Sequence, residues 1–248
     1  MNNIWVYSII SVVFVSLISL IGAVIIFINR ELSKETLLNL VAFSAGSMLG
    51  GAFFHLLPEA VNTMNITSVS IGALTGILLS YSVEMFLTWR HCHIPSSENH
   101  PHTFVYMNLI GDGVHNFIDG VVIAGTYMVD IRIGIITTLA IILHEIPQEI
   151  GDFGVIVYGG VEARKAIYYN LLSGVTAIGG ALLALLLGEY IEAFSVSIIP
   201  IALGNFLYIA CSDLVPELKD EKNLSYGIIR LLLLVFGVSL LYFFTFLE

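Results

Sequence analysis

Two otherwise apolar stretches of the sequence combine histidines with carboxylate and amide side chains. The residues concerned, three in each stretch, are His115, Asn116, Asp119, His144, Glu145 and Gln148. At 100° per residue of an α-helix, each set falls on one face, with a histidine and an oxygen ligand four residues apart. Imidazole nitrogen mixed with carboxylate and amide oxygen suits zinc, iron(II), manganese or cobalt. We therefore predict that these six residues bind a divalent transition metal, as one ion or two.

The same two faces carry further acids, Asp112 in the first stretch and Glu149 and Asp152 in the second. Pro147 also lies in the second stretch and is expected to kink the helix beside the ligands, since it removes one backbone hydrogen bond. Both stretches sit near the middle of runs long enough to cross a bilayer. A charge at that depth costs at least about 2.5–3.5 kcal/mol, so we expect something to compensate it.

Composition identifies an integral membrane protein. The 248 residues are 57% hydrophobic and 11% charged, whereas a soluble chain has about 25% charged residues. Apolar runs of about 20 residues each predict eight transmembrane helices, at residues 4–28, 37–57, 69–89, 104–129, 133–158, 166–187, 194–215 and 226–247. The predicted fold class is an all-α polytopic membrane protein with inverted repeats, forming a single domain over residues 1–248.

The net charge of −10, from 9 basic and 19 acidic residues, argues against nucleic acid as a partner. The predicted spans contain seven acids, Glu84, Asp112, Asp119, Glu145, Glu149, Asp152 and Asp213. Arg230 is the one basic residue inside them, near a membrane edge. The missing positive charge is therefore expected to come from a bound cation. Glu84 has no assigned role and is expected to be hydrogen-bonded within the bundle.

The basic residues also predict the orientation. Connections after spans 1, 3, 5 and 7, together with Arg230, hold eight of the nine Lys and Arg residues, and only Arg132 lies on the other side. Because basic loops stay in the cytoplasm, we expect a multi-pass protein of the plasma or inner membrane with both termini outside.

A repeat relates spans 2 and 7. Residues 46–59 and 204–217, offset by 158, read GSMLGGAFFHLLPE and GNFLYIACSDLVPE and share six of fourteen residues. His55 is opposite Asp213, and the final Pro-Glu pair is shared. Span 2 runs outward and span 7 inward, so the repeat is inverted, which is typical of secondary transporters.

With these residues in view, the chain resembles the ZIP (Zrt-, Irt-like) family of divalent metal transporters over essentially its whole length. The resemblance rests on eight spans, a His-containing cytoplasmic loop at 90–103, and the paired motifs at 115–120 and 144–152. The sequences of these two motifs are most similar to those of the LIV-1-like branch, which usually carries a second histidine where this chain has Gln148.

The resemblance implies a binuclear metal centre. His115, Asp119, His144 and Gln148 would hold the first ion, and Asn116, Asp119, Glu145 and Gln148 the second. It also implies that spans 1, 4, 5 and 6 move against spans 2, 3, 7 and 8, that the protein forms a homodimer, and that metal moves toward the cytosol. The expected substrate is a divalent cation, with zinc first and iron, manganese, cadmium or cobalt as alternatives, and no organic cofactor is expected.

Topology extends the predicted path on both sides. His55 and Glu59 near the outer end of span 2 are entrance candidates, and Asp213 and Glu217 mirror them at the inner end. Asp112, Glu149 and Asp152 lie on the cytoplasmic side of the ligands and are candidate exit ligands. The loop histidines His91, His93, His100 and His102 are candidates for a low-affinity cytoplasmic site, as an alternative to a plain solvated linker.

Two other function classes fit parts of the sequence. His144-Glu145-Ile146-Pro147-Gln148 resembles the H-E-x-x-H motif of zinc proteases, in which two histidines bind zinc and the glutamate activates water, but its fifth residue is Gln148. A metal sensor that binds without transporting is the second alternative. We expect no catalytic residues, because the inverted repeat and the extended polar path favour passage of the ion.

Overall fold

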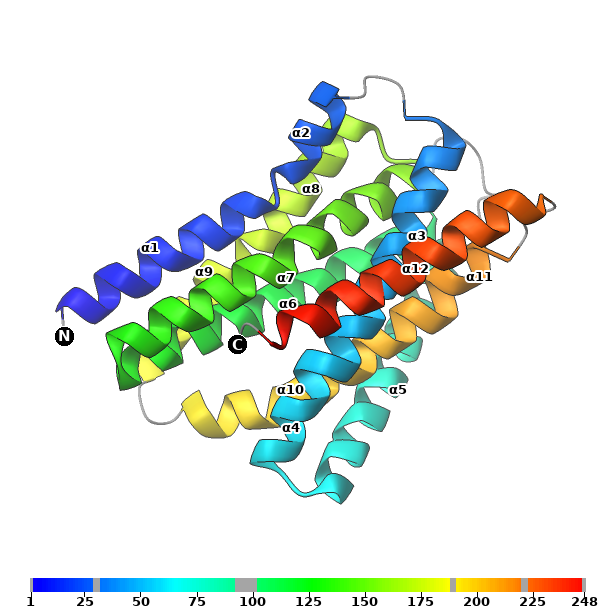
Figure 1. The fold of residues 1–248 in the computed structure, drawn as a ribbon. Helices are drawn as coiled ribbons and strands as arrows, with labels where there is room; N and C mark the ends of the chain where they lie inside the picture. Colours follow the sequence, from blue (N-terminus) through cyan, green and yellow to red (C-terminus); the bar gives the residue numbers. More distant parts are fainter. Residues whose placement is uncertain (1, 29–31, 92–101, 188–190, 220–222, 247–248) are drawn as a thin grey trace.

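The computed structural model describes residues 2–28, 32–91, 102–187, 191–219 and 223–246. Within them the chain forms eight helical segments, most of which lie lengthwise in one bundle (Figure 1). In chain order the elements are α1 (Asn2–Ile18), α2 (Ile21–Ile28), α3 (Lys34–Gly51), η1 (Ala52–Leu56), α4 (Leu57–Thr63), α5 (Ile66–His91), α6 (Thr103–Val129), α7 (Ile131–Tyr158), α8 (Ala163–Gly174), α9 (Thr176–Leu187), α10 (Ile191–Tyr208), η3 (Ile209–Leu214), α11 (Val215–Glu217) and α12 (Leu224–Phe244). The predicted all-helical membrane fold is confirmed.

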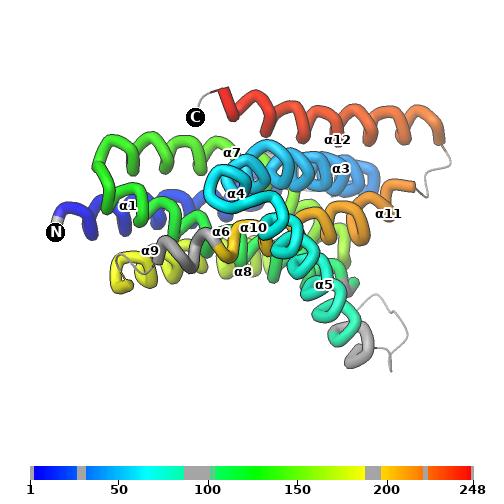
Figure 2. Tube along the Cα trace, turned by 90° about the horizontal axis from the view of Figure 1, so that it is seen from below, coloured from blue at the N-terminus to red at the C-terminus, as the bar shows by residue number. Residues whose placement is uncertain are grey.

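Seven of the eight segments in the described part of the chain are long and apolar enough to cross a membrane on their own. The eighth is α6, which has 27 residues but carries two aspartates, a histidine and two asparagines. Its polar content lowers its hydropathy, so α6 depends on its neighbours to hide those groups. Six described helices pack against α6, namely α1, α5, α7, α8, α9 and α10, and Figure 2 shows α6 among several of them.

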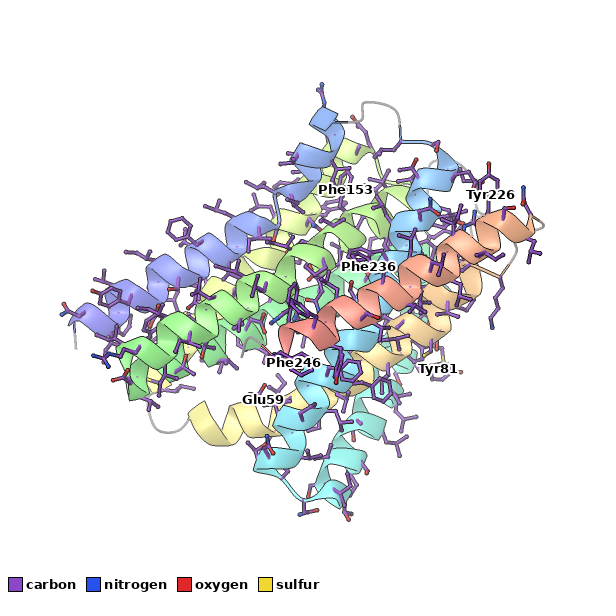
Figure 3. The ribbon with its side chains drawn as sticks, in the orientation of Figure 1. Glu59, Tyr81, Phe153, Tyr226, Phe236 and Phe246 are labelled. Atoms are coloured by element: carbon purple, nitrogen blue, oxygen red, sulfur yellow. The ribbon has the colours of Figure 1, made fainter. Side chains whose placement is uncertain are left out.

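The bundle presents an apolar surface, as lipid requires. Tyr81 on α5 and Phe236 on α12 are more than half exposed, and Figure 3 shows their side chains projecting from the ribbon. Phe153 on α7, by contrast, is completely buried. In water such exposed aromatic groups would cause aggregation, whereas in a bilayer they face acyl chains of similar polarity.

The structure divides spans 1 and 6, which the apolar runs at 4–28 and 166–187 predict as continuous. Span 1 breaks between α1 and α2 at Ser19 and Leu20, and span 6 breaks at Val175 between α8 and α9. Apolar periodicity does not reveal such a break, because the residues on both sides remain hydrophobic. The buried hydroxyl of Ser19 donates a hydrogen bond to Glu149 of α7, so the first break supplies a polar contact to the bundle core.

Both members of the sequence repeat contain a π-helical segment. η1 ends two residues before Pro58, and η3 ends two residues before Pro216. Proline has no N–H to donate, so a wider helical turn before it is a regular way to accommodate the missing bond. His55 lies in η1 and Asp213 in η3, which places the two candidate path residues at equivalent distortions.

Two helix pairs approach one another through glycine. Gly46 of α3 lies against the backbone carbonyl of Leu234 in α12, and the equivalent Gly204 of α10 lies against that of Ala73 in α5. An added Cβ at either glycine would overlap the neighbouring carbonyl. Small residues allow this close approach in membrane bundles, where helix association depends on van der Waals packing. Both members of the repeat therefore pack against a neighbouring helix through a contact between a glycine and a backbone carbonyl.

The α3–α12 contact gives a stability prediction. Gly46→Ala should lower the melting temperature of the purified protein in detergent by several degrees, because overpacking a close contact costs about 1–3 kcal/mol. Gly227→Ala in α12 is the matched control, since nothing lies within 4 Å of an added Cβ there and alanine is the better helix former. Equal or higher melting temperatures for both variants would contradict the packing.

Candidate metal centre

The junction between α6 and α7 fixes the register of the polar faces. α6 ends at Val129 and α7 begins at Ile131, with Asp130 as the one residue between them. The Asp130 carboxylate accepts hydrogen bonds from the backbone N–H groups of Arg132 and Ile133, which caps α7. Two antiparallel helices joined so tightly bring residues equally far from Asp130 to the same height. His115 and Glu145 are each fifteen residues from it.

Four predicted ligands meet at this height and form what we call the histidine site: His115, Asp119, His144 and Glu145. These four residues are at most 2% exposed, and one ligand atom from each lies within 4.8 Å of the others. The Oδ2 atom of Asp119 is 3.2 Å from Nε2 of His144 and 3.7 Å from Nε2 of His115. The Oε1 atom of Glu145 is 3.2 Å from Nε2 of His115 and 3.8 Å from that of His144.

These separations fit a tetrahedral ion. Bonds of 2.0–2.1 Å in a tetrahedron give ligand-to-ligand distances of about 3.3 Å, close to the four distances between the imidazole nitrogens and carboxylate oxygens. Several atoms of the site lack hydrogen bonds within the described residues, including both carboxylate oxygens of Glu145 and both ring nitrogens of His115. Buried polar atoms are normally satisfied, so the donor set suits a divalent metal.

The remaining two predicted ligands adjoin this set. Asn116 is fully buried and donates from Nδ2 to Oδ1 of Asp112 at 2.9 Å, while its own Oδ1 has no hydrogen-bond partner among the described residues. Nε2 of Gln148 lies 3.1 Å from where a Cβ on Gly51 of α3 would be. Gln148 therefore points toward α3, and its role as a ligand remains a prediction.

His55 reaches the same region from a third helix. Its ring centroid is 4.7 Å from that of His144. His55 belongs to the π-helical segment η1, so the widened turn lies directly beside the histidine site. The structure thus brings one predicted entrance residue into contact with a predicted ligand.

The other path candidates lie in three places. Asp112, Glu149 and Asp152, which we call the acidic cluster, form a second group of carboxylates within 4.8 Å of one another. Glu217 of α11 accepts a hydrogen bond from the Tyr158 hydroxyl at 2.8 Å, and Asp213 is buried on η3. Glu59 is half-buried on α4 (Figure 3).

Glu84, to which the sequence assigned no role, accepts a hydrogen bond from the Tyr208 hydroxyl, as expected for a group that is hydrogen-bonded within the bundle.

Most of the predicted loop site lies outside the described residues. This applies to His93 and His100 and to the side chain of His91, whose backbone closes α5. His102 is described, and it is exposed at the start of α6 with its ring stacked on Phe104. The loop site remains a prediction.

The sequence reasoning missed five polar neighbours of the acidic cluster: Ser19, Ser44, Asn108, Asn170 and Ser173. Asn108 had a readable signal, because it lies four residues before Asp112 and extends the polar face of α6 by one turn. The others come from spans 1, 2 and 6, and helical periodicity within one span does not say which residues of another span will meet it.

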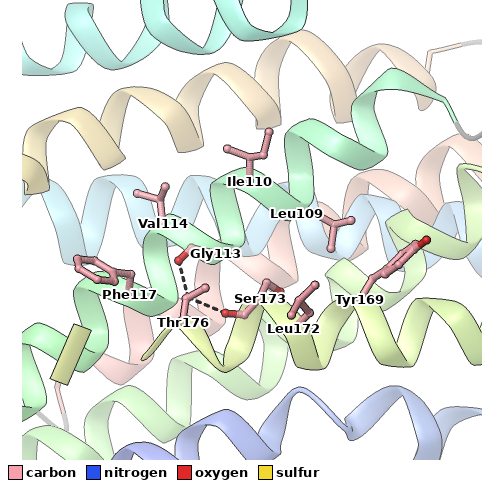
Figure 4. A pocket seen from close by; sticks show the side chains of 9 residues that line it. All are labelled: Leu109, Ile110, Gly113, Val114, Phe117, Tyr169, Leu172, Ser173 and Thr176. Atoms are coloured by element: carbon pink, nitrogen blue, oxygen red, sulfur yellow. Dashed lines mark hydrogen bonds between the residues drawn. The ribbon is translucent and has the colours of Figure 1, made fainter. Parts of the chain in front are cut away.

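A cavity of about 450 Å³ lies beside this region, between α6 and the helices α8 and α9. Phe117 and Leu172 contribute to its mainly apolar wall, and Ser173 and Thr176 line it as well (Figure 4). The hydroxyl of Thr176 donates to the carbonyl oxygens of Gly113 and Ser173, both at 2.6 Å. The bond to Gly113 joins α9 to α6, and the bond to Ser173 joins α9 to α8. The lining residues include no histidine, cysteine or carboxylate, so the cavity is poor in metal ligands.

Known proteins with similar sequences were then compared with the chain. The family model described as "ZIP Zinc transporter" matches residues 2–105 and 102–245. Zinc transporter ZIP13 of Pongo abelii is 29% identical over 234 residues, which cover 88% of this chain and 70% of that protein. Zinc transporter zipt-7.1 of Caenorhabditis briggsae is 27% identical over 99% of this chain and 80% of its own length. Human zinc transporter ZIP10 is 33% identical over 62% of this chain and 21% of its own length.

The geometry of the histidine site predicts metal binding that spectroscopy can measure. Cobalt(II) titrated into the purified protein should give the visible absorption of a low-coordinate site with nitrogen and oxygen ligands. Asp119→Ala or His144→Ala should weaken this binding by more than about a hundredfold, since even indirect partners of metal ligands contribute 10–100-fold. Glu162→Gln, at an exposed carboxylate that precedes α8, is the control. Unchanged titrations for both ligand variants would show that cobalt binds elsewhere.

Proposed function

The chain belongs to the ZIP zinc transporter family, and from that premise we propose that it carries divalent transition metal ions, zinc foremost, through the histidine site toward the cytosol. The observation that carries this proposal is the group of unsatisfied nitrogen and oxygen atoms between α6 and α7. Zinc is a substrate of this site and not a resident structural ion, because the path extends beyond it on both sides.

The residues have distinct roles in this proposal. His55 on η1 meets the ion at the outer side and passes it to His144, whose ring it touches. Asp119 lies between the two histidine rings of the site and keeps a ligand on the ion while the others exchange. The ion then moves along α6 and α7 toward the acidic cluster. Asn116 connects the two groups, since its amide touches Asp112.

Helix packing supports the proposed movement of two rigid groups. α3 with α12 and α5 with α10 are close-packed pairs within the less mobile group, spans 2, 3, 7 and 8. α6 and α9 form a similar pair within the moving group, where Gly120 lies against the backbone of Ala177 and Gly180 against that of Phe117. In this account spans 1, 4, 5 and 6 shift as a unit and carry the histidine site with them.

The two alternative functions are less well supported. The family is one of transporters, so the protease interpretation of His144-Glu145-x-x-Gln148 is set aside. A zinc protease with this motif would also need a second histidine at its fifth position, where this chain has Gln148. A sensor would not need carboxylates continuing past the metal along the same two helices.

Orientation and assembly belong to the proposal as well. The distribution of Lys and Arg supports a plasma or inner membrane protein with both termini outside. In this proposal the eight spans are an even number of crossings, which puts both termini on the same side of the membrane. We further propose a homodimer, which the family resemblance implies.

Reconstitution tests the transport function directly. Purified protein in liposomes loaded with a fluorescent metal indicator should take up zinc, and His144→Ala and Asp119→Ala should reduce uptake to the rate of empty liposomes. Glu162→Gln, outside every proposed metal site, should transport at the parent rate. If both ligand variants still carry zinc and manganese at the parent rate, the site assignment is wrong. Cleavage of a membrane peptide without flux would instead favour the protease.

Gln148 provides a test of metal preference. Gln148→His restores the histidine that LIV-1-like sequences usually carry, so it adds a softer nitrogen donor beside the site. We expect the ratio of zinc to manganese uptake to rise several-fold in a competition assay in proteoliposomes. Gln148→Asn, which keeps the amide, is the matched control. An unchanged ratio for Gln148→His would place residue 148 outside the coordination of the transported ion.

A further inference from the structure

The acidic cluster is separate from the histidine site and differs from it in chemistry. Asp112 comes from α6, and Glu149 and Asp152 come from α7. All three are at most 2% exposed. They lie one to two helical turns further from the Asp130 junction than the histidine site does, about 8 Å at 1.5 Å per residue. Every ligand atom that the cluster offers is oxygen.

The hydrogen bonds to the cluster come from neutral side chains. The hydroxyls of Ser19 and Ser173 donate to Glu149 and Asp112, respectively. Asp152 accepts from Asn108 at 3.2 Å and from the hydroxyl of Ser44 at 3.5 Å. These donors orient the carboxylates but contribute no positive charge. Three carboxylates so close together, away from water, would repel one another strongly without a cation.

Two buried amides give an independent indication of that cation. Asn108 donates through Nδ2 to Asp152, and Asn170 donates through Nδ2 to Glu149, so both amides point into the cluster. Both residues are fully buried, and the Oδ1 atom of each has no hydrogen-bond partner among the described residues. An amide turned by 180° exchanges its nitrogen and oxygen, which would present a carbonyl oxygen beside each carboxylate.

We propose that Asp112, Glu149 and Asp152, completed by the amide oxygens of Asn108 and Asn170, form a second divalent-cation site whose ligands are all oxygen and which therefore accepts Mn²⁺. Carboxylate and carbonyl oxygens suit manganese, magnesium and calcium, whereas imidazole suits zinc. The inference deepens the proposed function, because the site lies on the proposed path. Zinc that leaves the histidine site meets a site without nitrogen ligands, which holds it more weakly and favours its release.

Manganese binding tests the second site apart from the first. Mn²⁺ titrated into purified protein is followed by electron paramagnetic resonance, in which the free ion gives a signal that is lost on binding. The background variant carries His115→Ala and His144→Ala, which disable the histidine site. We expect this variant to retain one Mn²⁺ per chain. Adding Asp112→Asn and Asp152→Asn should weaken that binding at least about tenfold, since the charge of the ligands sets affinity in oxygen sites.

Further variants exclude a general effect on folding. Asn108→Leu in the same background should weaken Mn²⁺ binding, whereas Asn108→Asp should preserve or tighten it, because the added carboxylate supplies oxygen. Glu162→Gln, at an exposed carboxylate that precedes α8, should leave binding unchanged. The inference is overturned if the double-histidine variant binds no Mn²⁺, or if the acid substitutions leave its affinity unchanged. Zinc uptake by the parent protein is measured separately, so transport can persist while this inference fails.

Discussion

Buried negative charge without a basic partner is the constraint on which the rest of the structure depends. Asp119 and Glu145 lie in the histidine site and three more carboxylates in the acidic cluster, all on α6 and α7 and at most 2% exposed. Arg230, the basic residue within a predicted span, is bound instead to Glu35 at 2.7 Å. Ionised groups removed from water need compensation that serine and asparagine do not provide. We propose that the transported divalent cation supplies this compensation and so stabilises the core of the bundle.

The architecture follows from placing those charges together. The single-residue junction at Asp130 holds α6 and α7 in register, so two motifs about thirty residues apart meet at one height. The remaining helices pack against the polar faces of this hairpin, and the break in span 1 turns Ser19 toward Glu149. The π-helical segments η1 and η3 place His55 and Asp213 at distortions that repeat in the two halves. The structure thus combines close-packed helix pairs with local distortions of single helices. A transporter that alternates between two packing arrangements needs both.

The sequence was sufficient for the fold class and for the faces of single helices. Helical spacing predicted that His115 and Asp119 share one face, the family resemblance implied that this face meets His144 and Glu145, and the structure brings the four residues together. Helical spacing did not predict the breaks in spans 1 and 6, because the residues around each break are as apolar as those of an unbroken helix. Nor did it predict Asn170 beside Glu149, since that contact depends on tertiary packing between spans 5 and 6 and not on any local pattern.

The most direct test of the central claim is X-ray absorption at the zinc K edge of the purified, zinc-loaded protein. The account predicts a mixed first shell of nitrogen and oxygen at about 2.0–2.2 Å, with the outer-shell scattering of two imidazole rings from His115 and His144. Removal of either histidine should eliminate one ring from that signal. A shell made of oxygen alone, or one with cysteine sulfur, would contradict the claim that zinc is held between α6 and α7.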